Sequence, residues 1–180
     1  MGLQNQLKQP ILSSLQYLIS KLVAKVAFNL TDIAVKTSAN EFLQLTEIST
    51  QLLAKENRRV GSLGITGRLV EVPPVGEAII VGDIHGDLES LTHILENSNF
   101  MEKAKGGENI LLIFLGDYGD RGSYSPEVYY IVLKLKELFP ERVVLMRGNH
   151  EGPEDLLASP HDLPFHLNRK FGESGSEVYL

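Results

Sequence analysis

Hydrophobic residues in the first third of the chain recur at three- and four-residue steps, which is the spacing of one helix face. The first stripe predicts a helix from Pro10 to about Phe28, which could be a docking surface or could pack on the rest of the chain. The second stripe predicts a helix from Ser38 to about Asn57, beginning with the capping-box form Ser38-Ala-Asn-Glu41. We expect this second helix to pack on the domain that follows. Its predicted apolar face consists of Phe42, Leu45, Ile48 and Leu52.

After the second helix, the pattern changes to short apolar runs separated by helical stripes. Three glycines, Gly61, Gly64 and Gly67, indicate a loop at this change. We therefore divide the chain into an N-terminal helical segment, residues 1–67, and an α/β part, residues 68–180. The apolar runs predict strands at Glu77–Val81, Asn109–Leu115 and Arg142–Met146.

Two helices separate these strands. The first follows Asp87 as its N-cap, and the second opens with Ser125 as its cap and Pro126 in its first turn. The order is β-α-β-α-β, and strands joined through helices lie parallel, with right-handed crossovers expected. Continuous apolar runs further indicate strands that are covered on both faces.

The composition favours a soluble globular chain, with 43% hydrophobic and 22% charged residues among 180. The net charge of −6 argues against nucleic acid as the main partner, because phosphate contacts need clustered lysine and arginine. The absence of cysteine excludes disulfides and a cysteine nucleophile. No apolar run reaches the length of a membrane span and no signal pattern opens the chain, so we expect a cytoplasmic protein without membrane contact.

The first candidate motif, Gly82-Asp-Ile-His-Gly86, directly follows a predicted strand. Asp83 and His85 are two residues apart, a spacing that directs both side chains to the same side of an extended segment. A carboxylate and an imidazole together suit a transition metal such as Mn, Fe or Zn. The alternative is a surface turn with a solvated aspartate and histidine.

The second motif, Gly116-Asp-Tyr-Gly-Asp-Arg-Gly122, follows the next strand. Asp117 could bridge two ions through its two oxygens, and Asp120 could orient a histidine. Arg121 has the planar fork that grips a phosphate through two hydrogen bonds. The alternative is a surface ion pair between Asp120 and Arg121.

The third motif, Gly148-Asn-His-Glu151, follows the third strand. The Asn149 carbonyl oxygen could bind a second ion, and His150 could protonate a leaving oxygen. Glu151 could orient a neighbouring group or could be solvated. Outside the motifs, we expect His93 on the surface, whereas His161 or His166 could add a ligand.

The carboxyl ends of parallel strands meet at one edge of a sheet, where ligands bind. We therefore expect Asp83, Asp117 and Asn149 to converge there, although 34 residues separate the first pair and 32 the second.

These three motifs resemble the signature of the metal-dependent serine/threonine phosphoprotein phosphatases, within the calcineurin-like metallophosphoesterases. The resemblance covers about Glu71 to Glu151. It implies an α/β β-sandwich flanked by helices, of which only the first β-α-β-α-β half is present here, after an N-terminal helical segment. By that resemblance the metal ligands are Asp83, His85, Asp117 and Asn149, the catalytic residues are Asp120, Arg121 and His150, and Arg121 and Asn149 bind substrate.

The resemblance implies hydrolysis of phosphoserine or phosphothreonine in a protein substrate, by direct attack of a hydroxide held by two divalent transition-metal ions (Mn, Fe or Zn). Two alternatives remain open. The same site could cleave dinucleoside polyphosphates, or the chain could be a catalytically incomplete module that binds or oligomerises. Asp87 and Gly119 depart from the family pattern, which leaves the substrate class open.

The family supplies two further histidines and an arginine from a region downstream of the third motif. We therefore expect the second metal site to be incomplete in this chain, and the chain to be a truncated part of a larger phosphatase. A natural short form that pairs with another chain is the alternative. Exposed surfaces of a half-domain favour homo-oligomers, which is a further expectation.

Overall fold

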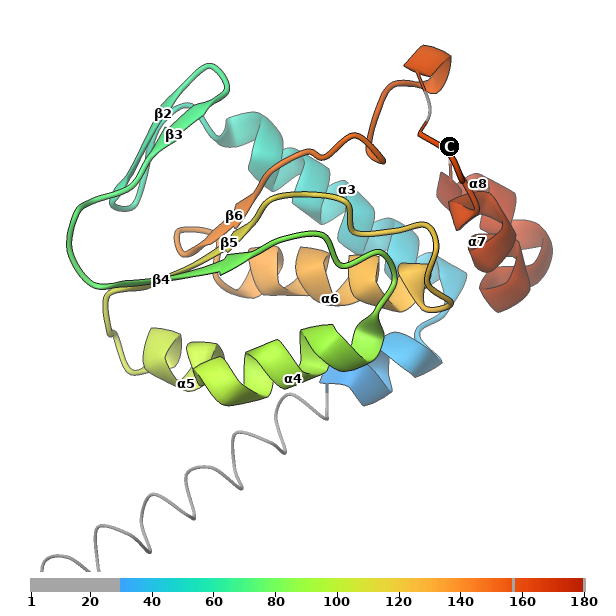
Figure 1. Cartoon of the computed structure of the whole chain (residues 1–180), viewed down its shortest axis with the longest axis horizontal. Coiled ribbons are helices and arrows are strands. Elements are labelled where there is room, and N and C mark those ends of the chain that lie inside the picture. The colour runs from blue at the N-terminus through green and yellow to red at the C-terminus, as the bar shows by residue number, and fades with distance from the viewer. Residues whose placement is uncertain (1–29, 157, 180) are drawn as a thin grey trace, which may run out of the picture.

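The computed structural model describes residues 30–156 and 158–179 (Figure 1). The predicted helix from Pro10 to Phe28 lies outside the described residues. Residues 30–36 are helical, and the remaining elements follow in chain order. They are α3 (Ala39–Lys55), β1 (Arg58–Val60), β2 (Leu63–Thr66), β3 (Leu69–Glu71), β4 (Glu77–Val81), α4 (Leu88–Ser98), α5 (Phe100–Lys105), β5 (Ile110–Phe114), α6 (Ser125–Leu138), β6 (Val143–Leu145), η1 (Glu154–Leu156), α7 (Leu163–Phe171), η2 (Gly172–Ser174) and α8 (Gly175–Tyr179).

The main sheet has the strand order β4-β5-β6, and both pairings are parallel. The predicted β-α-β-α-β order is thereby confirmed, with α4 and α5 between the first two strands and α6 between the last two. Helices α4, α5 and α6 lie on one side of this sheet (Figure 1). The hand of the crossovers stays a prediction.

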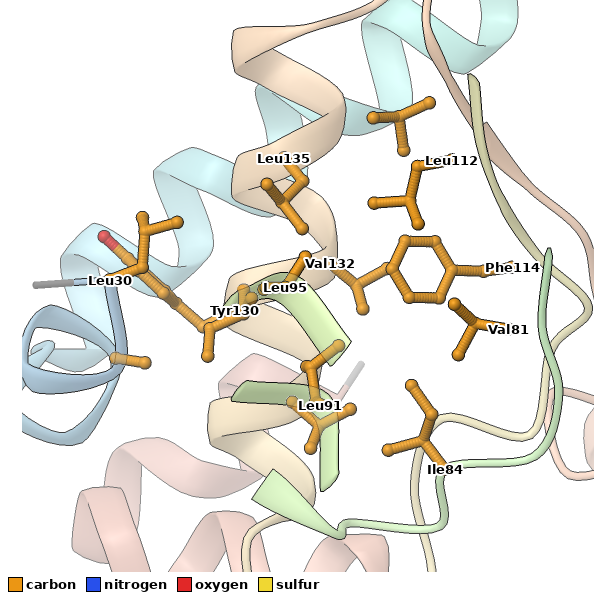
Figure 2. Packing of buried hydrophobic residues seen from close by; sticks show 14 of the residues in the cluster. Leu30, Val81, Ile84, Leu91, Leu95, Leu112, Phe114, Tyr130, Val132 and Leu135 are labelled. Atoms are coloured by element: carbon orange, nitrogen blue, oxygen red, sulfur yellow. The ribbon is translucent and has the colours of Figure 1, made fainter. Parts of the chain in front are cut away.

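Alternate residues of the central strand β5 point to opposite faces of the sheet and pack in different clusters. Leu112 and Phe114 face the helices and pack with Leu91 of α4 and Leu135 of α6, as Figure 2 shows. Leu111 faces the other way and packs with Leu63 of β2. Residues two apart in a strand point to the same face, so this alternation accounts for both clusters. The prediction of strands covered on both faces holds for β5 but not for β4, where Ile80 is 64% exposed.

The predicted loop at Gly61, Gly64 and Gly67 is wrong in part. Strands β1, β2 and β3 form an antiparallel three-stranded sheet there, with Gly64 inside β2 and the other two glycines at its turns. Leu63 and Ile65 alternate with Gly64 and are buried, so this small sheet covers part of the main sheet.

The predicted capping box at the start of α3 is confirmed. The Ser38 side chain accepts from the Glu41 N–H, and the Glu41 carboxylate accepts from the Ser38 N–H. The predicted apolar face is right for Phe42 and Leu45, but Ile48 is 41% exposed and Ser49 is buried in its place.

Of the two predicted N-cap residues, Asp87 is confirmed and Ser125 is wrong. Asp87 caps α4 as predicted, because its side chain accepts from the Ser90 N–H. Ser125 is instead the first residue of α6, and Tyr124 occupies the cap position.

The C-terminal helix α7 is bonded to earlier elements through a lysine. Lys170 in α7 donates to the backbone oxygens of Ala34 and Val35, at 2.9 and 3.0 Å, and to the Glu127 carboxylate of α6, at 2.6 Å. No helix among the described residues is long and apolar enough to cross a membrane.

Candidate metal centre

The loops that follow β4 and β5 are joined by backbone hydrogen bonds. The N–H groups of Ile84 and His85 both donate to the Asp117 oxygen, at 3.0 and 2.9 Å, and the Gly86 N–H donates to the Tyr118 oxygen, at 2.8 Å. These bonds hold the first two motifs side by side at one edge of the sheet. The predicted convergence of the first and second motifs is therefore confirmed.

Asp83, His85 and Asp117 form a compact group. Each offers one ligand atom, and these atoms all lie within 4.8 Å of one another. The His85 Nε2 atom is 3.8 Å from the Asp83 Oδ2 and 4.0 Å from the Asp117 Oδ2. Asp83 is exposed, whereas Asp117 is 7% exposed, so the group is open to solvent at Asp83.

The tautomer of His85 is determined by its other nitrogen. His85 Nδ1 lies 2.9 Å from the Gly119 carbonyl oxygen, which can only accept, so Nδ1 carries the hydrogen. The Nε2 atom is then the one that lies near the two carboxylates. Nε2 is buried and has no hydrogen-bond partner among the described residues.

A divalent transition-metal ion fits this donor set. Two carboxylates and an imidazole suit Mn, Fe or Zn, and a backbone carbonyl on the second nitrogen is the usual support for a metal-binding histidine. A cation would also supply the partner that Nε2 lacks. The residues present therefore fit the ion that the sequence predicted for this edge.

Glu151 connects the second and third motifs. Its Oε2 accepts from the N–H groups of Asp117, at 2.7 Å, and Gly148, at 3.0 Å. Its Oε1 accepts from the Tyr118 N–H, at 2.9 Å, and the Tyr129 hydroxyl, at 2.8 Å. Of the two open interpretations of Glu151, orientation of neighbouring groups is the one that the structure supports. The third motif also bonds directly to the second, since the His150 N–H donates to the Asp117 Oδ1 at 2.9 Å.

The Glu151 carboxylate also affects the pKa of two neighbouring tyrosines. Burial, followed by the nearby Glu151 carboxylate, raises the pKa of both Tyr118 and Tyr129 well above that of an ordinary tyrosine. Both hydroxyls therefore stay neutral across the ordinary pH range.

Four residues of the motifs adopt the left-handed backbone region that non-glycine residues avoid. The φ angles are 47° for His85, 53° for Asp117, 62° for Asp120 and 66° for Arg121. Each such residue costs on the order of 1 kcal/mol, so the surrounding hydrogen bonds must hold it in place. Backbone strain of this kind gathers at functional sites, and here it gathers in the first two motifs.

Asp120 and His150 form a buried pair beside the metal group. His150 Nδ1 is 2.7 Å from the Asp120 Oδ2, and the two residues are 5% and 1% exposed. Burial acts to raise the pKa of Asp120, but hydrogen bonds from His150, the Leu163 N–H and His161 outweigh it and hold this pKa below the ordinary value. Asp120 is therefore an ionised acceptor for His150, as predicted for a histidine-orienting carboxylate.

Arg121 lies on the exposed side of this pair. Its Nη2 is 3.2 Å from the His150 Nε2, and because a guanidinium can only donate, Nε2 is the acceptor. No ion pair joins Asp120 to Arg121 in the part of the chain that the structure describes, so the alternative of a surface ion pair is wrong. Arg121 as a whole is an exposed residue.

The remaining predicted residues fall into two groups. Asn149 is exposed, and its roles as a ligand of a second ion and in substrate binding stay predictions. His93 is exposed, as expected. His166 is buried 3.7 Å from Asp162 and does not belong to the metal group.

His161 is the site residue whose position the sequence did not predict. It contacts Asp120 rather than a metal-group carboxylate, with Nδ1 3.1 Å from Oδ2. The only sequence signal was the histidine itself, in a stretch with no helical or strand period.

A family model described as calcineurin-like phosphoesterase matches residues 78–179, more than half of the chain. Serine/threonine-protein phosphatase 7 of Arabidopsis thaliana is 32% identical over 140 residues, covering 78% of this chain and 30% of that protein. Shewanella-like protein phosphatase 1 of Plasmodium berghei is 46% identical over 81 residues, covering 42% of this chain and 22% of that protein. The chain thus spans less than half the length of these curated relatives.

The fold is similar to that of a solved protein serine/threonine phosphatase of Saccharomyces cerevisiae, which is described as similar to human phosphatase PP5. The TM-score is 0.53 at 21% identity, and the match covers 79% of this chain and 41% of that chain. At this identity the likeness bears on the fold alone, and it agrees with the α/β architecture expected from the motifs. With the family match over residues 78–179, the chain belongs to the calcineurin-like phosphoesterase family.

Proposed function

We propose that this chain carries part of the active site of a metal-dependent phosphoserine/phosphothreonine protein phosphatase, which hydrolyses a phosphomonoester directly. One observation carries the proposal. The metal group and the Asp120–His150 pair are adjacent, with the His85 and His150 rings edge to face and their centroids 4.7 Å apart. A candidate proton donor thus lies beside a candidate cation site, as hydrolysis of a phosphoester requires.

Divalent ions, when bound, would lower the pKa of water and neutralise charge on the phosphoryl oxygens. Asp83, His85 and Asp117 would hold one ion, and Asp117 would share a second ion with Asn149. The identity of the ions as Mn, Fe or Zn is part of the proposal, and rests on the mixed oxygen and nitrogen donors.

The chain's own residues would handle the substrate and the proton. Arg121 is exposed and would turn from the His150 Nε2 to the phosphate, which its planar fork can grip through two bonds. His150 Nε2 would then be free to take up a proton from solvent water and to give it to the leaving oxygen. Asp120, ionised and bonded to Nδ1, would stabilise the imidazolium that forms before this transfer.

The proposed substrate is a phosphorylated protein. Relatives such as serine/threonine-protein phosphatase 7 and serine/threonine-protein phosphatase 4 catalytic subunit carry this activity in their names. The expected homo-oligomer and cytoplasmic location remain predictions alongside this one.

The test supplies the purified chain with Mn²⁺ and three substrates: a phosphoserine peptide, p-nitrophenyl phosphate and diadenosine tetraphosphate. We expect phosphate release from the first two, which Asp117→Asn abolishes and the exposed-site control Asp155→Asn leaves intact. Activity confined to diadenosine tetraphosphate would reject the protein-phosphatase assignment. Mn²⁺ binding by calorimetry without turnover of any substrate would instead make the chain a metal-binding module.

A further inference from the structure

A second histidine shares the oxygen that orients His150. Asp120 Oδ2 is 2.7 Å from the His150 Nδ1 and 3.1 Å from the His161 Nδ1. The other nitrogen of the His161 ring also has a partner, since its Nε2 is 2.9 Å from the Tyr179 hydroxyl in α8. A continuous chain of hydrogen bonds therefore runs from Tyr179 through His161 and Asp120 to His150.

Three successive residues from the C-terminal segment support Asp120. The N–H groups of Asp162 and Leu163 donate to its Oδ1, at 2.9 and 2.8 Å, and His161 contacts its Oδ2. With His150 as the fourth partner, both carboxylate oxygens accept two hydrogen bonds each. A carboxylate held by four donors cannot rotate without breaking at least one of them.

The direction of each hydrogen bond follows from the chemistry of the partners. An ionised carboxylate only accepts, so both imidazoles carry hydrogen on Nδ1. In a neutral His161 the Nε2 atom then accepts, and the Tyr179 hydroxyl donates to it. In a neutral His150 the Nε2 atom is likewise the acceptor, toward Arg121. A single assignment of protons therefore satisfies every hydrogen bond from Tyr179 to His150.

We propose that His161, itself oriented by Tyr179, is a positioning residue that fixes Asp120 and thereby holds His150 in the Nδ1–H tautomer with Nε2 facing the reaction site. His161 touches neither the metal group nor the guanidinium of Arg121, so it acts through Asp120 alone. The catalytic consequence rests on the proposed function, whereas the tautomer of His150 can be measured in the chain whether or not it turns over substrate.

The alternative is that His161 only fastens the C-terminal segment to the domain. The two roles differ in what they change. A fastening role alters stability but leaves the His150 tautomer as it is, because the Asp162 and Leu163 N–H groups still hold Asp120. A positioning role alters the tautomer in a chain that remains folded.

The test measures imidazole tautomers by long-range ¹H–¹⁵N correlation NMR on the full chain with ¹⁵N-labelled histidine. Variants are His161→Phe, His161→Asn and Tyr179→Phe, with the exposed His93→Phe as the matched control. We expect His150 to be Nδ1–H in the parent and the control, and to become a mixture of tautomers in His161→Phe. His161→Asn, whose amide can donate as Nδ1–H does, should restore the parent pattern, and Tyr179→Phe should fall between.

A second readout applies once turnover is established. Loss of a well-placed proton donor affects an alkyl leaving group more than an aryl one, so His161→Phe should lower kcat for a phosphoserine peptide by about tenfold or more and leave p-nitrophenyl phosphate nearly unchanged. Equal losses on both substrates, or an unchanged His150 tautomer in folded His161→Phe, would overturn the proposal. A chain without turnover defeats the proposed function only, because the NMR result still decides the role of His161.

Discussion

The Glu151 carboxylate should hold the second and third motifs together, and Glu151→Gln tests this with a change of one atom. The carboxylate accepts four hydrogen bonds, from the N–H groups of Asp117, Gly148 and Tyr118 and from the Tyr129 hydroxyl. A glutamine amide offers one accepting oxygen and one donating nitrogen. In either orientation of the amide, two of the four donors must therefore face its nitrogen, which also donates.

The less costly orientation can be identified from the partners. Placing the amide nitrogen at the Oε2 position would set it against two backbone N–H groups, neither of which can accept. At the Oε1 position it faces one backbone N–H and the Tyr129 hydroxyl, which can turn and accept. The Tyr118 N–H then loses its partner, and the remaining bonds lose the contribution of the negative charge.

The expected loss follows from these two changes. One unsatisfied N–H and weaker bonds to a neutral acceptor, at a half-buried site, together cost about 2 kcal/mol in the free energy of unfolding. For a chain of this size, that corresponds to a decrease in Tm of roughly 4–8 °C. Urea unfolding followed by circular dichroism measures it, with the exposed Glu141→Gln as control. The same midpoint for both variants would refute the role of Glu151.

Three further predictions concern the C-terminal segment and the site. Lys170→Met leaves the buried Glu127 carboxylate unpaired and should destabilise the chain by about 3 kcal/mol in urea unfolding, with much of the loss recovered when Glu127→Gln is added; equal losses in the single and double variants would contradict this. Because the folded-state pKa of Asp120 is lowered, its contribution to stability is present above the ordinary carboxyl value of 3.8 and is lost as pH falls below it. The stability gap between the parent and Asp120→Asn should therefore narrow in acid, as measured by urea unfolding at successive pH values, and a constant gap would oppose this. Gly148→Ala places a Cβ 2.1 Å from a metal-group carboxylate oxygen and should weaken Mn²⁺ binding in calorimetry, whereas Gly82→Ala, whose Cβ meets open space, should not; equal affinities would argue against the site.

The elements that the sequence could predict are those with local signals. The capping box at Ser38 and the N-cap at Asp87 depend on hydrogen bonds within three residues, so they form wherever the helix forms. The apolar run of β5 is continuous because both faces of this strand are covered, whereas β4 has an equally apolar run although Ile80 is exposed. The choice of Ser49 over Ile48 on the buried face of α3 depends on what the helix packs against, which no local pattern contains.

The small sheet β1-β2-β3 was missed for a related reason. Its strands are three or four residues long and its turns carry glycine, so the segment looks like a loop. What stabilises it is long-range contact, since Leu63 packs on Leu111 and Val144 of the main sheet. In strands this short, the alternation covers too few residues to distinguish a strand from a loop.

The candidate site, too, has features that could be predicted from local sequence signals and features that could not. Convergence of the motif carboxylates could be predicted, because parallel strands present their carboxyl ends at one edge. The contacts of Glu151 and His161 could not, since both depend on where loops and the C-terminal segment lie. Glu151 reaches Asp117 and Tyr129, 34 and 22 residues away in sequence, and His161 reaches Asp120, 41 residues away.

The hydrogen bonds of the site indicate which of its acceptor atoms are left for a cation. Asp120 and Glu151 have all their oxygens occupied by donors, and Asp117 Oδ1 accepts from the His150 N–H. In contrast, His85 Nε2 is buried without a hydrogen-bond partner among the residues that the structure describes, and the Asp83 and Asp117 carboxylate oxygens near it are also acceptors. Three acceptors within 4.8 Å of one another repel each other unless a positive charge lies between them. The strained backbone at His85 and Asp117 maintains this unfavourable arrangement in the folded chain, so ion binding should raise stability, and Asp117→Asn should remove most of that gain.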